Sequence, residues 1–157
     1  MRRWIVSDQE SAAVVTWLRL MRVYHRIQQA AASQLRDHGL TLSQFDVLAQ
    51  VGADEGLTQQ DLADRLLVTK SNVSQLLDRM ARSGLVEREP EGRVCRLRLT
   101  AQGRAIREKV LPLHEALITE QFAALDVDER TTLQRILREL DQALGRANAE
   151  PVMAARQ

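Results

Sequence analysis

Five polar side chains in one short stretch of the chain have the chemistry that reads the edges of DNA bases. Serine and asparagine near a helix N-terminus can meet base edges or phosphate, glutamine can pair bidentately with adenine, and lysine and arginine can hold phosphates on either side. The five residues are Lys70, Ser71, Asn72, Gln75 and Arg79. Because any soluble helix exposes residues of these types, an ordinary solvated surface is an equal interpretation of this stretch taken alone.

Four arginines follow within a segment that alternates apolar with polar residues. Residues 85–88 and 94–99 show the period of two that is typical of strands, and the segment 89–93 between them contains the proline and glycine of a turn. The pattern predicts a β-hairpin that carries the guanidinium groups of Arg88, Arg93, Arg96 and Arg98. This concentration of positive charge favours contact with a nucleic acid over an ordinary surface.

Three short helices are predicted just before the hairpin, over about 41–53, 58–67 and 69–83, and each begins with a capping threonine. A glutamine or aspartate three residues after the first two threonines completes a capping box. The second and third of these helices stand in tandem and should pack on each other through Leu62, Ala63, Leu66, Val68, Val73 and Leu76. Two tandem helices followed by a basic hairpin predict a winged helix-turn-helix, which leaves the five polar residues on the outer face of its second helix.

Longer amphipathic helices flank this region. Apolar residues recur at helical spacing over 10–36, again from Thr100 with a kink expected at Pro112, and again from Asp126. After Ala147 the pattern stops, so we expect a flexible tail over 148–157. The predicted fold is mainly α with a small β-wing and about six helices.

The charge is distributed in blocks along the chain, although the net charge is only +1. Residues 1–40 carry a balance of +3, residues 41–64 carry −5 with no base at all, residues 65–109 carry +6, and residues 110–157 carry −3. The +6 block contains both the predicted polar helix and the hairpin. It is the electrostatic footprint expected where phosphate is bound, although a solvated charged surface could also produce it.

Composition and motifs argue against several other classes of protein. A chain of 157 residues with 45% hydrophobic residues can form one ordinary domain, no apolar run is long enough to cross a membrane, and we expect a cytoplasmic protein. The three histidines lack the spacing of metal ligands, and no nucleophile stands near a base, so we expect no enzyme, metal or cofactor. The single cysteine, Cys95, alternates in phase with Leu97 and Leu99 and should face inward as a small hydrophobic residue.

Taken together, these motifs resemble the MarR family of bacterial regulators over roughly residues 10–147. The segments that carry the resemblance are Leu42-Ser43-Gln44-Phe45-Asp46-Val47-Leu48, Leu62-Ala63, Val73-Ser74-Gln75-Leu76-Leu77-Asp78-Arg79-Met80, Gly84-Leu85-Val86-Glu87-Arg88 and Leu97-Arg98-Leu99-Thr100-Ala101-Gln102-Gly103. The family's wing usually has Asp-x-Arg where this chain has Glu91-Gly92-Arg93. The resemblance implies that Arg93 enters the minor groove while Glu91 braces it. This wing turn is about three residues shorter than usual and should reach less far.

The resemblance further implies a homodimer that binds a palindromic operator on double-stranded DNA and acts as a repressor. The implied domains are a dimerisation helix over 1–40, a DNA-binding lobe over 41–100 and dimerisation helices over 101–147. Relatives commonly bind aromatic anions between the dimer helices and the lobe, which would release the DNA. Candidate ligand contacts are Trp17, Arg22, Tyr24, His25, Phe45 and His114, although residues of these types are more often ordinary core or surface.

A winged-helix module that binds another protein is the competing interpretation. Such a module should have lost the charge on its recognition helix and wing, and this chain keeps both. Binding to random duplex DNA separates the two, because phosphate contacts make the affinity fall steeply with salt.

Overall fold

The computed structural model describes residues 8–92 and 94–154, with side chains over 12–92 and 94–146. The described part contains six helices and one two-stranded antiparallel sheet, which confirms the predicted fold class. The chain divides after Leu117 into two compact units. None of the described helices is long and apolar enough to span a bilayer.

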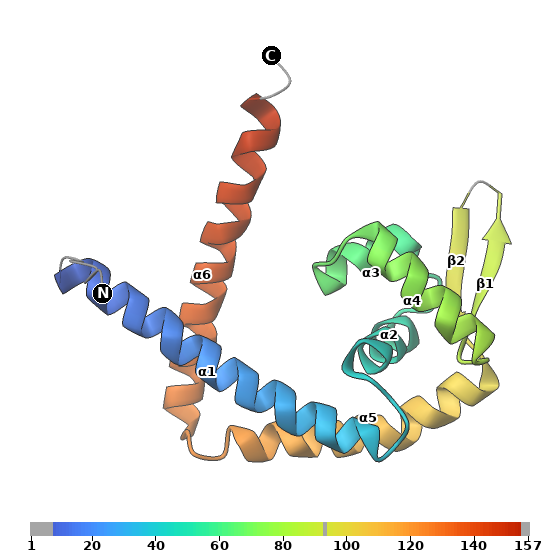
Figure 1. The fold of residues 1–157 in the computed structure, drawn as a ribbon, viewed down its shortest axis with the longest axis horizontal. Helices are drawn as coiled ribbons and strands as arrows, with labels where there is room; N and C mark the ends of the chain where they lie inside the picture. Colours follow the sequence, from blue (N-terminus) through green and yellow to red (C-terminus); the bar gives the residue numbers. More distant parts are fainter. Residues whose placement is uncertain (1–7, 93, 155–157) are drawn as a thin grey trace, which may run out of the picture. The chain divides into compact units, whose positions relative to one another are not determined.

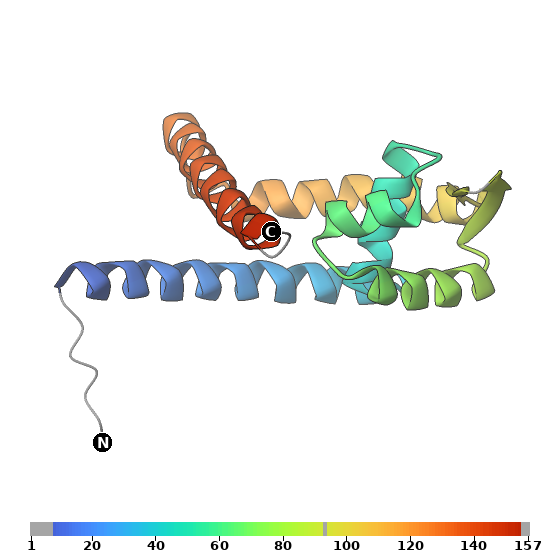
Figure 2. The same cartoon turned by 90° about the horizontal axis from the view of Figure 1, so that it is seen from above.

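The first unit holds α1 (Asp8–Arg36), three short helices, the hairpin and most of α5 (Ala101–Gln121). The short helices are α2 (Leu42–Ala53), α3 (Gln59–Leu66) and α4 (Lys70–Arg82). They gather beside the hairpin, and the N-terminal half of α1 extends away from them (Figure 1, Figure 2). This cluster forms the lobe that positions the candidate site.

Each short helix begins at the threonine that the sequence predicts. The Thr41 hydroxyl accepts a hydrogen bond from the Gln44 amide at 3.2 Å, and the Gln44 side chain accepts one from the Thr41 amide at 2.9 Å. Thr58 and Asp61 form the same capping box at the start of α3. The Thr69 hydroxyl accepts from the Asn72 amide at 3.3 Å and fixes the start of α4. Local hydrogen bonding therefore sets the N-terminus of each helix.

The turn between α3 and α4 is tight and uses a left-handed residue. Leu67 has φ +54°, the Val68 amide donates to the Ala63 carbonyl at 3.1 Å, and the Leu67 side chain is 88% exposed. Leu62, Ala63, Val73 and Leu76 are buried between the two helices as predicted. Val68 is not, because the turn leaves it 44% exposed.

The hairpin consists of β1 (Val86–Glu91) and β2 (Val94–Leu99), paired from Val86 opposite Leu99 to Glu91 opposite Val94. β2 has the predicted bounds, but β1 is longer than predicted, because residues 89–91 that were expected in the turn belong to it. Leu97 and Leu99 are buried, but Cys95 is exposed, so the expected inward position of Cys95 is wrong. Cys95 has the correct phase, but it lies opposite Pro90 in the outer part of the hairpin, beyond the reach of the core.

Beyond the lobe, α5 continues as a helix through Pro112 to Gln121. The second unit is built around α6 (Val127–Ala154), where Asp126 and Glu129 exchange capping hydrogen bonds of 2.9 Å. The helix continues into the segment 148–157 that the sequence analysis expects to be a tail. The end of the apolar pattern therefore does not mark the end of the helix.

Candidate nucleic-acid interface

The outer face of α4 is an exposed polar surface held in place by a buried apolar face. Val73, Leu77 and Met80 have no exposed surface, and Leu76 is 9% exposed. The five residues selected from the sequence all lie on the exposed side, namely Lys70, Ser71, Asn72, Gln75 and Arg79. Their predicted position on the helix is confirmed, and their role in DNA binding stays a prediction.

The N-terminus of α4 is braced by the helix before it. The Gln59 side-chain amide donates to the Lys70 carbonyl at 3.1 Å, so the start of α3 holds the start of α4. The amides in the first turn of a helix carry partial positive charge and favour an anion. Lys70 and Ser71 stand in this turn. The arrangement therefore presents a lysine, a hydroxyl and a helix N-terminus together at one end of α4.

Arg88, which the sequence predicts as a DNA contact, is paired with residues of the lobe. Its Nη1 donates to the Asp78 carboxylate at 2.7 Å and its Nη2 donates to the Ser74 carbonyl at 3.3 Å. Both partners belong to α4, and the Arg88 side chain is only 32% exposed. Its guanidinium group thus joins β1 to α4 through two hydrogen bonds, while its buried Nε has no partner among the described residues.

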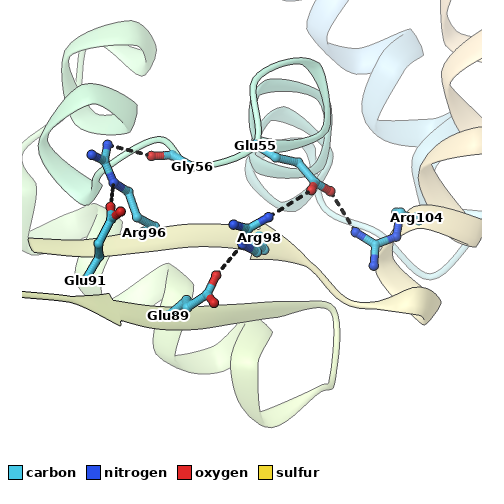
Figure 3. A network of polar contacts seen from close by, with 7 residues as sticks. All are labelled: Glu55, Gly56, Glu89, Glu91, Arg96, Arg98 and Arg104. Atoms are coloured by element: carbon cyan, nitrogen blue, oxygen red, sulfur yellow. Dashed lines mark hydrogen bonds and ion pairs between the residues drawn. The ribbon is translucent and has the colours of Figure 1, made fainter.

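Two further hairpin arginines also have acidic partners (Figure 3). Arg96 Nε donates to Glu91 at 2.7 Å, and its Nη1 donates to the Gly56 carbonyl at 3.0 Å. Arg98 forms an ion pair with Glu89 and lies 3.7 Å from the Glu55 carboxylate. Arg93, the residue predicted to enter the minor groove, lies outside the described residues. A count of hairpin arginines therefore overstates the charge available to phosphate.

Within the lobe, the positive charge that has no acidic partner lies on α4 instead. Among the described side chains of residues 41–100, the bases that make no ion pair are Lys70, Arg79 and Arg82, and all three are exposed. The sequence analysis missed Arg82, although its place three residues after Arg79 on the same helix was a usable signal. Glu87 and Glu89 lie directly opposite Arg98 and Arg96, and this alternation of acids and bases was likewise a signal for pairing across the hairpin.

The structure brings together two of the six candidate ligand residues. The rings of Phe45 and His114 lie 4.4 Å apart, and His114 Nδ1 lies 3.3 Å from the side-chain oxygen of Gln34. Gln34 also donates to the Leu113 carbonyl at 2.9 Å, so α1, α2 and α5 meet at this point. Burial lowers the pKa of His114, while the negative charge of Asp46 opposes the shift.

The other four candidates are exposed residues of α1. Trp17 is 58% exposed and Tyr24 is 49% exposed, and Tyr24 packs loosely on His25 with ring centroids 5.8 Å apart. Arg22 is also exposed. In this single chain these residues form a surface and not a pocket.

Known proteins are similar to this chain in sequence and in fold. A model of the MarR family matches residues 38–96. An uncharacterized HTH-type transcriptional regulator of Bacillus cereus is 35% identical over 124 residues, which are 79% of this chain and 82% of the relative. AbsC, a MarR family transcriptional regulator from Streptomyces coelicolor, superimposes with a TM-score of 0.80 at 28% identity, covering 91% of this chain and 98% of AbsC.

Two solved structures with bound partners also match. A mutant of MarR from Escherichia coli, complexed with operator DNA, has a TM-score of 0.76 at 26% identity and covers 85% of this chain and 99% of that one. The Mycobacterium tuberculosis MarR family protein Rv2887, complexed with salicylic acid, has a TM-score of 0.61 at 27% identity, covering 77% and 92%. The capped tandem helices, the hairpin and these similarities lead to one conclusion: the chain belongs to the MarR family of winged helix-turn-helix transcriptional regulators.

Proposed function

We propose that this regulator binds duplex DNA as a homodimer, with α4 of each subunit in the major groove, and represses transcription from the bound operator. The observation that carries the proposal is the outer face of α4, where exposed Lys70 and Arg79, which form no ion pair with any described residue, flank side chains able to read bases. The E. coli relative solved with operator DNA supports it. The proposed contacts are Lys70, Ser71, Asn72, Gln75 and Arg79, with Arg93 from the hairpin. Arg88, which the sequence also predicts as a contact, is paired with Asp78 and is proposed to hold β1 against α4.

The proposed dimer rests on apolar surface that a single chain leaves in solvent. Both α1 and α6 expose large apolar side chains, which are Val14, Val15, Trp17, Leu18, Leu20, Val23 and Tyr24 on α1 and Val127, Ile136, Leu137, Leu140 and Leu144 on α6. Apolar surface on this scale calls for a partner. A two-fold dimer would present two α4 helices to half-sites about one helical turn apart, so the operator should be an imperfect palindrome.

The salt dependence of binding to duplex DNA tests the role of α4. Each phosphate contact contributes about 0.9 to the slope of log affinity against log salt concentration. Because a dimer would lose two contacts, Arg79→Gln should reduce the slope by about 2. Arg138→Gln, which removes the same charge from α6, should leave the slope nearly unchanged. Equal effects from both variants would refute the assignment of α4.

Binding to a second protein is the alternative use of this fold. The ion pairs that neutralise Arg88, Arg96 and Arg98 are the observation that favours it. A wild-type protein with no salt-dependent affinity for duplex DNA would favour this alternative.

We further propose that a small aromatic anion lowers DNA affinity by binding where α1 and α5 meet the lobe. The ring pair of Phe45 and His114 at this junction, and the salicylic acid complex of Rv2887, support the proposal. Thermal shift against a panel of phenolic acids, followed by DNA titration with each hit, tests it. A compound that stabilises the protein without changing its DNA affinity would contradict it.

A further inference from the structure

The loop between α2 and α3 is joined to the hairpin by backbone pairing. The Gly56 amide donates to the Leu97 carbonyl at 2.9 Å, and the Leu97 amide donates to the Leu57 carbonyl at 2.8 Å. Thr58 forms an isolated antiparallel bridge with Arg96. The loop thus lies along the edge of β2 that does not face β1. It holds the hairpin of β1 and β2, which we call the wing, at Arg96 and Leu97.

Glu55 extends this attachment with its side chain (Figure 3). One carboxylate oxygen accepts a hydrogen bond from Arg104 Nη1 of α5 at 2.7 Å, and the other lies 3.7 Å from Arg98 Nη1 of β2. Arg98 in turn pairs with Glu89 of β1. A single carboxylate therefore connects the start of α5 with both strands of the wing.

We propose that Glu55 is a positioning residue for DNA binding, which sets the wing relative to α4 by holding Arg98 and Arg104. The inference rests on the proposed function of the lobe. In this proposal Arg98 helps to hold the hairpin in position and does not contact a DNA phosphate. Wing direction determines where the tip of the hairpin meets DNA, so a loosened wing loses contacts that Glu55 itself does not make.

Whether Glu55→Gln raises or lowers DNA affinity distinguishes a positioning role of Glu55 from a long-range electrostatic effect of its charge. Removing an acid makes the protein more positive, so long-range electrostatics alone predicts that Glu55→Gln binds DNA more tightly. Positioning predicts weaker binding, by about fivefold for the loss of a surface ion-pair network. Glu108→Gln is the matched control, because Glu108 is an exposed acid of α5 that forms no ion pair with any described residue, and its loss should leave affinity unchanged or slightly higher.

The wing carries its own probe for a second measurement that needs no DNA. Cys95 is the only cysteine in the chain and is exposed on β2. A nitroxide attached to Cys95 should give narrower lines in the electron paramagnetic resonance spectrum of Glu55→Gln than in that of the wild type, because the label moves more freely. The spectrum of Glu108→Gln should match that of the wild type. A domain that had merely lost stability would not show this change well below its unfolding temperature.

Either an unchanged nitroxide spectrum or a Glu55→Gln affinity equal to that of Glu108→Gln would overturn the proposal. Should Glu55→Gln fail to fold, Arg98→Gln provides the same test, with weaker binding at an unchanged salt slope expected. A slope reduced as much as in Arg79→Gln would place Arg98 on a phosphate and overturn the proposal. Absence of salt-dependent binding by the wild type would instead refute the proposed function, and the nitroxide spectra would still test the attachment of the wing.

Discussion

The junction between the hairpin and α5 depends on a glycine that has no room for a side chain. A Cβ atom at Gly103 would overlap the Leu85 carbonyl oxygen and would lie 3.0 Å from its carbonyl carbon. That oxygen accepts a hydrogen bond from the Thr100 amide at 3.2 Å, and the Thr100 hydroxyl donates to the Gly84 carbonyl at 2.6 Å. The Leu85 carbonyl therefore cannot move away without breaking the start of α5. We predict that Gly103→Ala destabilises the protein.

The magnitude follows from two opposing effects. Alanine should gain about 1 kcal/mol over glycine inside a helix. Forcing a methyl group into a packed backbone contact costs about 1–3 kcal/mol, and losing the buried hydrogen bond to Leu85 adds about 1 kcal/mol or more. The free energy of unfolding should fall by about 1–3 kcal/mol, which for a chain of this length lowers the unfolding midpoint by roughly 2–12 °C.

Thermal unfolding followed by circular dichroism measures this change at matched protein concentration. Gly145→Ala is the control, because a Cβ at Gly145 meets no atom within 4 Å and the substitution should leave the midpoint unchanged or raise it. If Gly103→Ala proves as stable as Gly145→Ala, the close contact between α5 and Leu85 is not present in the protein.

Three further predictions concern pH and backbone strain. Because burial lowers the pKa of His114 below its unfolded value, stability should fall as pH decreases below about 6.5, and melts at pH 7 and pH 5 should show a smaller fall in His114→Gln. Hydrogen bonds from Thr58 lower the pKa of Asp61, so Asp61→Asn should be less stable than the wild type at neutral pH, and chemical denaturation should show the difference shrinking as pH falls below 3.8. Leu67→Asn should raise the unfolding midpoint, because asparagine tolerates φ +54° better than leucine and the exposed Leu67 side chain has little packing to lose. A lower midpoint would mean that the Leu67 side chain is packed against other residues in solution.

Local chemistry explains why much of the lobe could be predicted from sequence. The threonine caps act through residues only three positions away, so their pattern is visible in the sequence and is confirmed at Thr41, Thr58 and Thr69. The outer face of α4 follows from the periodic burial of Val73, Leu77 and Met80. Cys95 shows the limit of such reasoning, because strand phase gives the side of a residue and not how far the core extends along the strand.

The charge network could not be predicted in the same way. Glu55 meets Arg98 and Arg104 across more than forty residues of sequence, and the diagonal pairs Glu89–Arg98 and Glu91–Arg96 depend on the register of the hairpin. From the sequence the acidic block over 41–64 and the arginines that follow it are two separate charge features. In the folded lobe one carboxylate of that block pairs with two of these arginines.

Selection of bound sequences from a random duplex DNA library tests the central claim, that a dimer recognises DNA through two α4 helices. We expect enrichment of an imperfect palindrome whose half-sites lie about one helical turn apart, with the preference lost or relaxed in Gln75→Ala. No enrichment, or a single asymmetric half-site bound by one subunit, would contradict the claim.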